Sequence, residues 1–308
     1  MPRRKATPLE QSQPAPASPL EAMYASVTAE PYSVRQRDGF SVSGIGKCAA
    51  EQLFALAGFP QANPPSPRTR MVWEMGDHVE QIIVRRFRKA GFVIVGQQKQ
   101  FVGSEPPREG HIDGLVLWHG KLVPFDAKSA NARSFDEWLS LTGISRSSTW
   151  GRGWASFDPR RIADTSYRPI RQMYPSYYQQ ALGYMGLINS LPVYREYRID
   201  NMASVPDELA AAAVNGAVPI ATDGFFFWVY CKDDSRMYEE LVPFDEEALN
   251  DRLRYLAEGY AAVKGKRRTP ALIQQIRQYR EVPRNDDGKL HWKCQRCPFL
   301  KICWEEDV

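Results

Sequence analysis

The sequence predicts an α/β fold in which a central mixed β-sheet is flanked by helices. Apolar runs of strand length, two of them separated by only two residues, alternate with longer segments that carry apolar residues at helical spacing. We expect a single domain, preceded by a disordered tail that is rich in Pro, Ala and Ser. The tail spans residues 1–20 and the domain residues 21–308, with strands in 110–129, 194–200 and 224–232 and helices over 74–90, 174–189 and 244–263.

The composition is that of a soluble globular protein. The chain has 308 residues, of which 43% are hydrophobic and 25% charged, a length that suffices for a substantial core. The formal net charge is only +4, so a nucleic-acid partner has to be argued from local clusters of charge. No apolar run in the sequence approaches the ~20 residues that span a bilayer, and the basic N-terminus lacks the apolar stretch of a secretory signal. We therefore expect no membrane partner.

The N-terminal part predicts a helix and a loop. Order is expected to begin near Ser41, followed by a helix that Ser43 caps and Gly58 ends. Four prolines within residues 60–69 then predict a loop.

The helix after this loop contains a histidine. His78 stands three residues after Met75 and four before Ile82, so we expect it on the buried side of the helix. Gly91 ends the helix, and a strand over residues 92–102 leads into a hairpin. A lone histidine on an apolar face is usually a core residue, but the carboxylates that follow make a metal-ligand role the alternative.

One hairpin pattern organises the chain. Two apolar-rich runs, residues 111–118 and 121–129, are separated by a two-residue loop that contains glycine, which is a strong hairpin signal. In that register Asp113 faces Asp126, with their Cβ atoms ~5 Å apart on one face of the sheet. Lys128 lies two residues further along and projects from the same face.

The two facing aspartates indicate a cation site. Like charges held opposite one another destabilise a sheet unless something compensates them. A divalent cation is the natural compensation, and carboxylate oxygens suit Mg²⁺ or Mn²⁺. The plainer alternative makes both groups surface carboxylates with Lys128 as an ordinary counter-charge. The apolar residues in both runs favour a packed sheet instead.

Residues 130–171 interrupt the alternation of predicted strands and helices. We expect an irregular insertion there, longer than a compact domain normally leaves unstructured. Arginines that contact phosphates, together with aromatic rings that stack on bases, are typical of a surface that binds single-stranded nucleic acid. A solvated loop whose aromatic residues pack locally is the alternative. The candidate binding residues are Arg146, Trp150, Arg152, Trp154, Arg160 and Arg161.

The helix over residues 174–189 has two distinct faces. An amphipathic stripe carries Tyr177, Gln180 and Tyr184 at the spacing i, i+3, i+7. This stripe either borders a site, with Tyr177 as a further nucleic-acid contact, or serves packing alone. The core side is expected to hold Tyr178, Ala181, Leu182 and Met185.

The C-terminal half completes the sheet and covers it. An Ala-rich helix over residues 206–213 is expected between the two later strands, and Cys231 closes the second of them as a core or edge residue. The helix over residues 244–263 begins at an Asp245 cap.

Three cysteines near the C-terminus, spaced C-x2-C-x5-C, predict a four-ligand metal centre that a distant residue completes. Cys48 is the expected fourth ligand, and His291 is an alternative. Both zinc and a [4Fe-4S] cluster accept four thiolates, although three clustered cysteines with one distant partner favour the cluster. Cysteines used in this way indicate a reducing cytosol. The centre would join the segment 290–304 to the N-terminal helix through Cys48, Cys294, Cys297 and Cys303.

In their order and spacing, these residues resemble the PD-(D/E)XK nuclease superfamily. The similarity is to its RecB-like iron-sulfur branch, which includes the AddB nuclease domain and the CRISPR-adaptation exonucleases. It covers most of residues 41–304. The matching motifs are His78 in GDHVEQ, Asp113 in GHIDG, Asp126 and Lys128 in FDAKS, Gln180 and Tyr184 in QALGY, and the four cysteines.

The resemblance implies a restriction-endonuclease-like core and a division of roles among these residues. Lys128 would orient the attacking water and steady the charge on the phosphate, and Gln180 and Tyr184 would assist at the substrate side. The cysteines would hold a [4Fe-4S] cluster. The implied ligands of Mg²⁺ or Mn²⁺ are His78, Asp113, Asp126 and the main-chain carbonyl of Ala127.

We therefore expect a metal-dependent DNA nuclease, an exonuclease on single-stranded or frayed ends, in the cytoplasm of a bacterial, archaeal or phage-infected cell. Its partners would be proteins of recombination, repair or CRISPR adaptation. One alternative is a DNA-binding or adaptor subunit that keeps the fold without cleaving, against which the complete His, Asp, Asp and Lys set argues. Another is a zinc-stapled module that acts on RNA.

Overall fold

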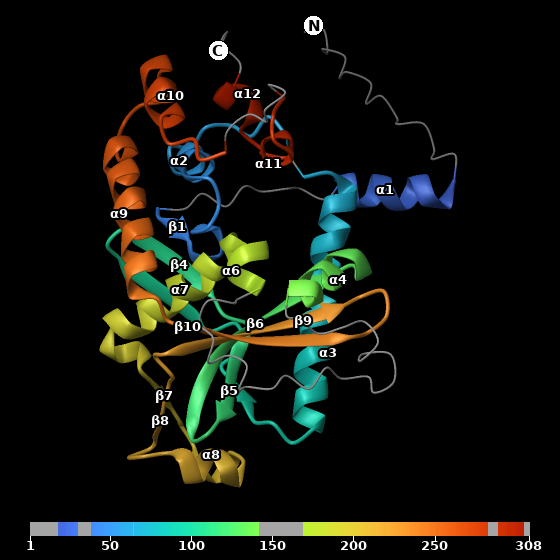
Figure 1. Ribbon diagram of the computed structural model, residues 1–308, viewed down its shortest axis with the longest axis vertical. Helices are drawn as coiled ribbons and strands as arrows, with labels where there is room; N and C mark the ends of the chain where they lie inside the picture. Colours follow the sequence, from blue (N-terminus) through green and yellow to red (C-terminus); the bar gives the residue numbers. More distant parts are fainter. Residues whose placement is uncertain (1–17, 30–37, 64, 142–168, 283–288, 305–308) are drawn as a thin grey trace, which may run out of the picture.

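The fold is known from a computed structural model that describes residues 18–29, 38–63, 65–141, 169–282 and 289–304 (Figure 1). Most of the predicted N-terminal tail lies outside these residues. So do six of the predicted DNA-binding residues, namely Arg146, Trp150, Arg152, Trp154, Arg160 and Arg161.

A five-stranded mixed sheet forms the centre of the molecule. Its two longest strands, β6 and β9, run parallel, whereas the other neighbouring pairs are antiparallel. This arrangement confirms the predicted mixed sheet. In spatial order the strands are β10 (Met237–Pro243), β9 (Gly224–Cys231), β6 (Lys121–Ala130), β5 (Gly114–Trp118) and β2 (Ile94–Val95).

The register of the β5–β6 hairpin is the predicted one. Trp118 pairs with Lys121 at the turn and Gly114 pairs with Phe125 at the far end, so the next position brings Asp113 opposite Asp126. Successive side chains along a strand point to opposite faces. The hairpin register therefore places Asp113, Asp126 and Lys128 on one face.

Helices cover the two faces of the sheet (Figure 1). α3 (Pro67–Lys89) lies against one face, where its Phe87 ring stacks on Trp228 at a centroid distance of 4.0 Å. α7 (Pro175–Ser190) lies on the other face and belongs to the larger core cluster. α9 (Glu246–Val263) packs against α7, and Leu249 of α9 fills the space beside Gly186.

The remaining elements surround this core. A three-stranded sheet contains β1 (Phe40–Ser41), β4 (Pro107–His111) and β3 (Gln100–Ser104), and a two-stranded sheet contains β7 (Glu196–Arg198) and β8 (Ala217–Pro219). The other helices are α1 (Pro19–Ala29), α2 (Ala49–Leu56), α4 (Ala132–Leu141), α6 (Pro169–Met173), α8 (Asp207–Ala212), α10 (Pro270–Arg277), α11 (Trp292–Gln295) and α12 (Leu300–Trp304), with short 3-10 turns η1 (Val42–Gly44), η3 (Pro192–Tyr194) and η4 (Met202–Ser204). Within the described ranges, no helix is both long and apolar enough to cross a membrane.

Several predicted boundaries were wrong. α3 begins at Pro67 instead of residue 74, because proline is tolerated in the first turn and the Ser66 hydroxyl accepts a hydrogen bond from the Thr69 amide at 3.2 Å. The helix predicted from Ser43 is broken into η1 and α2. α1 and α10 are further helices that the prediction left out.

The segment 130–171 is not irregular at its ends. α4 follows β6 after a single residue, because Asn131 accepts a hydrogen bond from the Ser134 amide at 2.8 Å and so caps the helix. α6 precedes α7 at the other end. The prediction of an irregular insertion was therefore wrong at both borders.

Candidate active site

Asp126 and Lys128 lie together on the face of β6 that is turned toward α7. The Lys128 Nζ is 2.6 Å from the Asp126 Oδ1, and the Asp126 side chain is only 4% exposed. The second oxygen, Oδ2, accepts a hydrogen bond from the Gln180 side-chain amide. Both oxygens of this carboxylate are thus fixed, one by a charge on its own strand and one by the helix above it.

Asp113 holds the second carboxylate beside the first. Its Oδ2 accepts a hydrogen bond from the Ala127 amide at 2.7 Å, which ties the residue before β5 to the middle of β6. Burial and the neighbouring charge of Asp126 raise the pKa of Asp113 to about 8, and the Lys128 charge opposes this only in part. The site therefore concentrates more negative charge than its single lysine balances.

Two tyrosines of α7 complete the wall around Lys128. The Tyr184 hydroxyl donates to the His111 carbonyl at 2.5 Å and anchors the chain just before Asp113. The Tyr177 ring lies 4.8 Å from the Lys128 Nζ, as in a cation–π contact. Burial is the largest single influence on the pKa of Lys128 and lowers it, but the Asp126 charge, with smaller contributions from Tyr177 and Asp113, makes the net shift upward. The net shift therefore favours the charged form of this lysine.

A third carboxylate, which the sequence analysis missed, comes from α3. Glu80 lies close enough for Asp126 to raise its pKa, although burial is the larger cause of the upward shift. The Gln98 side-chain amide donates to both Glu80 carboxylate oxygens at 3.1 Å and approaches Asp113 Oδ1 at 3.5 Å. Glu80 and Asp113 thus share a donor.

The predicted burial of His78 was wrong, because this residue is exposed on α3. Each residue advances an α-helix by about 100°, so side chains two residues apart point in nearly opposite directions. A helix that turns Glu80 toward the site therefore turns His78 away from it. The register that favours Glu80 follows from the buried positions Val79 and Ile83.

The site can accept a divalent cation by the chemistry of its donors. Oxygen ligands are those that Mg²⁺ and Mn²⁺ prefer, and the pKa of Asp113 is raised first by burial and then by the Asp126 charge, both of which a bound cation would offset. In the present arrangement hydrogen bonds from Gln98, Gln180 and Ala127 hold the carboxylates. No three His, Cys, Asp or Glu side chains among the described residues are close enough together to form a ready metal site.

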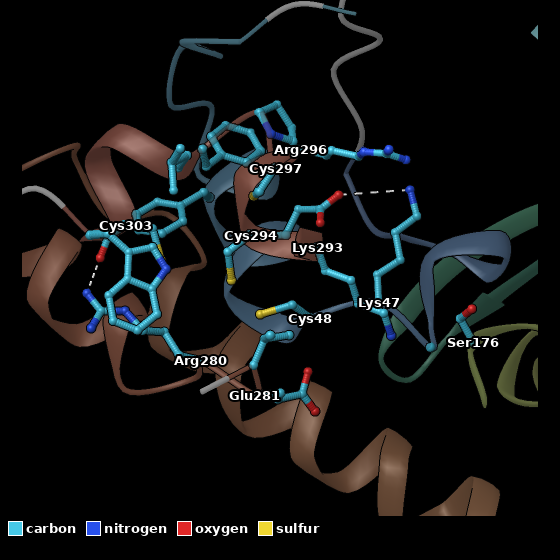
Figure 2. A pocket seen from close by; sticks show the side chains of 18 residues that line it. Lys47, Cys48, Ser176, Arg280, Glu281, Lys293, Cys294, Arg296, Cys297 and Cys303 are labelled. Atoms are coloured by element: carbon cyan, nitrogen blue, oxygen red, sulfur yellow. Dashed lines mark hydrogen bonds and ion pairs between the residues drawn. The ribbon is translucent and has the colours of Figure 1, made fainter. Parts of the chain in front are cut away.

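The four predicted cysteines line one cavity of about 500 Å³ at the other end of the molecule. Figure 2 shows Cys48 at the start of α2, facing the C-terminal segment that carries Cys294, Cys297 and Cys303. The structure therefore brings these cysteines to a common cavity. Cys231 is elsewhere, fully buried in β9.

This cavity suits a thiolate-bound group. Burial raises the pKa of Cys297 to about 12 and shifts those of Cys294 and Cys303 upward as well, so the thiolates need positive charge to form. Four thiolates around Zn²⁺ or a [4Fe-4S]²⁺ cluster leave a net charge of −2. Basic residues that line the cavity can balance this charge, namely Lys47, Arg280, Lys293 and Arg296. The alternative ligand His291 instead caps α11, where its Nδ1 accepts from the Lys293 amide at 3.2 Å.

The loop that carries Cys48 is fixed from the C-terminal side. The Glu281 carboxylate accepts a hydrogen bond from the Ala49 amide at 2.5 Å and pairs with Arg252. Arg252 also donates to the carbonyls of Ile45 and Lys47, at 2.6 and 2.5 Å. Charge-assisted bonds of this kind are stronger than neutral ones, so the loop is well determined.

The same loop touches the first turn of α7. A Cβ placed on Gly46 would lie 2.3 Å from the Ser176 Cα, a contact that the two backbones cannot relieve without moving. We expect Gly46→Ala to lower the free energy of unfolding by about 1–3 kcal/mol. Gly76→Ala is the matched control, because nothing lies within 4 Å of its added Cβ, and the helix should gain roughly 0.5–1 kcal/mol. Equal effects of the two changes in chemical denaturation would contradict the close contact.

No protein-family model matches the chain, and no curated protein sequence matches it. Among solved structures it is similar to an alkaline exonuclease from Laribacter hongkongensis, with 13% identity, a TM-score of 0.40, and coverage of 84% of this chain and 95% of that one. The complex of that enzyme with dAMP gives 12% identity and a TM-score of 0.36 over the same shares of the two chains. The structure of SSO0001 gives 10% identity and a TM-score of 0.42, covering 94% of this chain and 98% of that one. The functional conclusion therefore rests on the residues of the site itself.

Proposed function

We propose that the protein is a metal-dependent nuclease that hydrolyses phosphodiester bonds in DNA. The observation that carries this proposal is the set of three carboxylates, Glu80, Asp113 and Asp126, that feel the charge of one half-buried lysine, Lys128, which pairs directly with Asp126. Phosphodiester hydrolysis requires positive charge on the phosphate and an oriented water. The resemblance of these motifs to PD-(D/E)XK nucleases supports DNA as the substrate.

Each side chain has a defined task in this proposal. Lys128 stays protonated, so it steadies negative charge on the phosphate and orients the attacking water instead of acting as a base. Gln180 fixes the Asp126 carboxylate, and Tyr184 fixes the main chain ahead of Asp113. A displacement of about 1 Å in the position of a catalytic group can lower the rate about 10²-fold. Gln180 and Tyr184 are both buried, so the packing around them limits such displacements.

The proposed ligands of Mg²⁺ or Mn²⁺ are Asp113, Asp126, Glu80 and the main-chain carbonyl of Ala127. Glu80 takes the place that the sequence analysis gave to His78. When bound, the cation polarises a phosphate oxygen and lowers the pKa of a bound water. The proposed ligands of the [4Fe-4S] cluster, or of zinc, remain Cys48, Cys294, Cys297 and Cys303.

Cleavage of end-labelled DNA tests the proposal. Single-stranded and blunt double-stranded substrates are incubated with the full chain and Mg²⁺ or Mn²⁺, because the preference for single strands and for ends is part of the proposal. We expect Asp126→Ala and Lys128→Ala to lower the cleavage rate by at least about 10²–10³-fold. Lys121→Ala is the matched control, since this exposed lysine starts the same strand.

Three outcomes separate the candidate functions. The proposal is refuted if the wild-type protein shows no metal-dependent cleavage, or if Asp126→Ala and Lys128→Ala cleave DNA at the wild-type rate. Salt-dependent DNA binding without turnover would favour the non-cleaving adaptor subunit instead. Faster turnover of RNA than of DNA would favour the zinc-stapled RNA module.

A further inference from the structure

Gln98 stands between two of the carboxylates of the site. It belongs to the turn that connects β2 and β3, and its side chain reaches from this exposed turn to the site. The amide nitrogen lies 3.1 Å from each Glu80 carboxylate oxygen and 3.5 Å from the Asp113 Oδ1. A single neutral donor thus faces two acidic groups that come from different elements.

The backbone of Gln98 is held in a conformation that glutamine rarely adopts. Its φ angle is +55°, in the left-handed region that normally favours glycine. Such strain persists only where the surroundings require it, and it gathers at functional sites. Glycine would satisfy this turn at lower cost, as Gly96 does two residues earlier with a φ of +59°. The turn therefore does not explain why residue 98 carries a side chain.

The contacts of the side chain supply that explanation. Glu80 and Asp113 are both acidic, and the Glu80 charge is one of the smaller causes that raise the pKa of Asp113. A donor that both share holds them near one another without adding a charge that would compete with a cation. Partners that orient ligating carboxylates in this way typically change metal affinity by 10–100-fold.

We propose that Gln98 is a positioning residue for the divalent cation: its amide orients the Glu80 and Asp113 carboxylates that would bind Mg²⁺ or Mn²⁺. This inference rests on the proposed function, because it assumes that these carboxylates bind the ion. It assigns a role to a residue outside the motifs that the sequence analysis singled out.

Two substitutions at this position separate positioning from a role in the turn. Gln98→Ala removes the amide and keeps the strained backbone, whereas Gln98→Gly removes the amide and relaxes the backbone. We expect both to weaken Mn²⁺ binding to the full-length protein about tenfold, measured from the free-ion signal in electron paramagnetic resonance. In chelator, Gln98→Gly should melt about 2–4 °C above Gln98→Ala, because only the alanine variant retains the strain.

His119 provides the matched control. It has a φ of +47° in the β5–β6 turn, so His119→Ala and His119→Gly should reproduce the difference in melting temperature and leave Mn²⁺ affinity unchanged. If Gln98→Gly recovers wild-type Mn²⁺ affinity together with its stability, residue 98 serves only the turn and the proposal is wrong. Wild-type affinity in Gln98→Ala would overturn it as well.

The outcome for the wild-type protein distinguishes this inference from the proposed function. A wild type that neither binds Mn²⁺ nor cleaves DNA refutes both. A wild type that binds Mn²⁺ and cleaves DNA, with Gln98 variants of unchanged affinity, refutes the role of Gln98 alone.

Discussion

Asp113→Asn is expected to abolish metal-dependent DNA cleavage and, in chelator at pH 8, to raise the melting temperature. Asparagine keeps an oxygen that can accept from the Ala127 amide at the distance seen for Asp113, 2.7 Å. It removes the negative charge that burial and Asp126 oppose. The substitution should therefore lower the cleavage rate by about 10²–10³-fold while it stabilises the metal-free fold.

The stability that Asp113→Asn gains over wild type in chelator depends on pH, in the direction that the pKa shift of Asp113 determines. The pKa of Asp113 rises from 3.8 to about 8 in the folded chain, so between these values the native state binds more protons than the unfolded state. Stability in chelator should therefore fall as pH rises from about 4 to 8, by at most about 1.4 kcal/mol per pH unit. The advantage of Asp113→Asn should grow over the same interval.

Thermal melts of both proteins at pH 5, 6.5 and 8, with chelator or with Mn²⁺, measure this effect. Wild type should gain stability from Mn²⁺ and the variant should gain little, since only a bound ion stabilises the native state. Asp200→Asn is the control, because this aspartate is exposed after β7 and should leave the pH slope unchanged. A variant that melts below wild type at pH 8 in chelator would contradict the charge imbalance.

Cys48→Ala is expected to remove the proposed metal centre of the cysteine cavity and to destabilise the fold. The proposed group, held by four thiolates, would link the start of α2 to the C-terminal segment, and structural metal centres contribute directly to folding free energy. We expect anaerobically purified wild type to absorb in the visible range and the variant to lose this absorption, together with a lower melting temperature.

Cys231→Ala is the control for this loss. Its side chain is fully buried in β9 away from the cavity, so the variant should lose some packing energy and keep the visible absorption. Colourless wild-type protein with one zinc per chain would replace the iron assignment by zinc. Wild type without stoichiometric iron or zinc would refute the four-thiolate centre.

Much of the central sheet could be predicted because its signals are local. The two-residue loop with glycine set the hairpin register, and the Asp245 carboxylate accepts from the Ala248 amide at 3.0 Å as its predicted role as cap requires. β2, β8 and β10 were missed or misplaced, because short strands and edge strands take their structure from neighbours distant in sequence. α3 was predicted too short, because the prolines were taken as loop without the Ser66 cap.

The site was predicted where contacts follow from strand register and not where they depend on packing. Asp113, Asp126 and Lys128 follow from one hairpin, and Gln180 follows from the helical stripe of α7. Glu80 was missed because the histidine nearby matched a family motif. The apolar positions Val79, Ile83 and Val84, which are the buried residues of α3, were the signal for the correct face.

The first turn of α7 has a consequence for the order in which the molecule is assembled. Ser176 lines the cysteine cavity beside Gly46, and the next residue, Tyr177, lies over Lys128. The hydrogen bond from the Ala49 amide to Glu281 closes a loop of more than two hundred residues, and contacts of such separation form late in folding. During synthesis the ribosome supplies the last cysteines after every carboxylate of the site. The loop around Cys48, which contacts the first turn of α7 through Gly46, therefore gains its anchor on Glu281 only after Asp113, Asp126 and Lys128 have been synthesised.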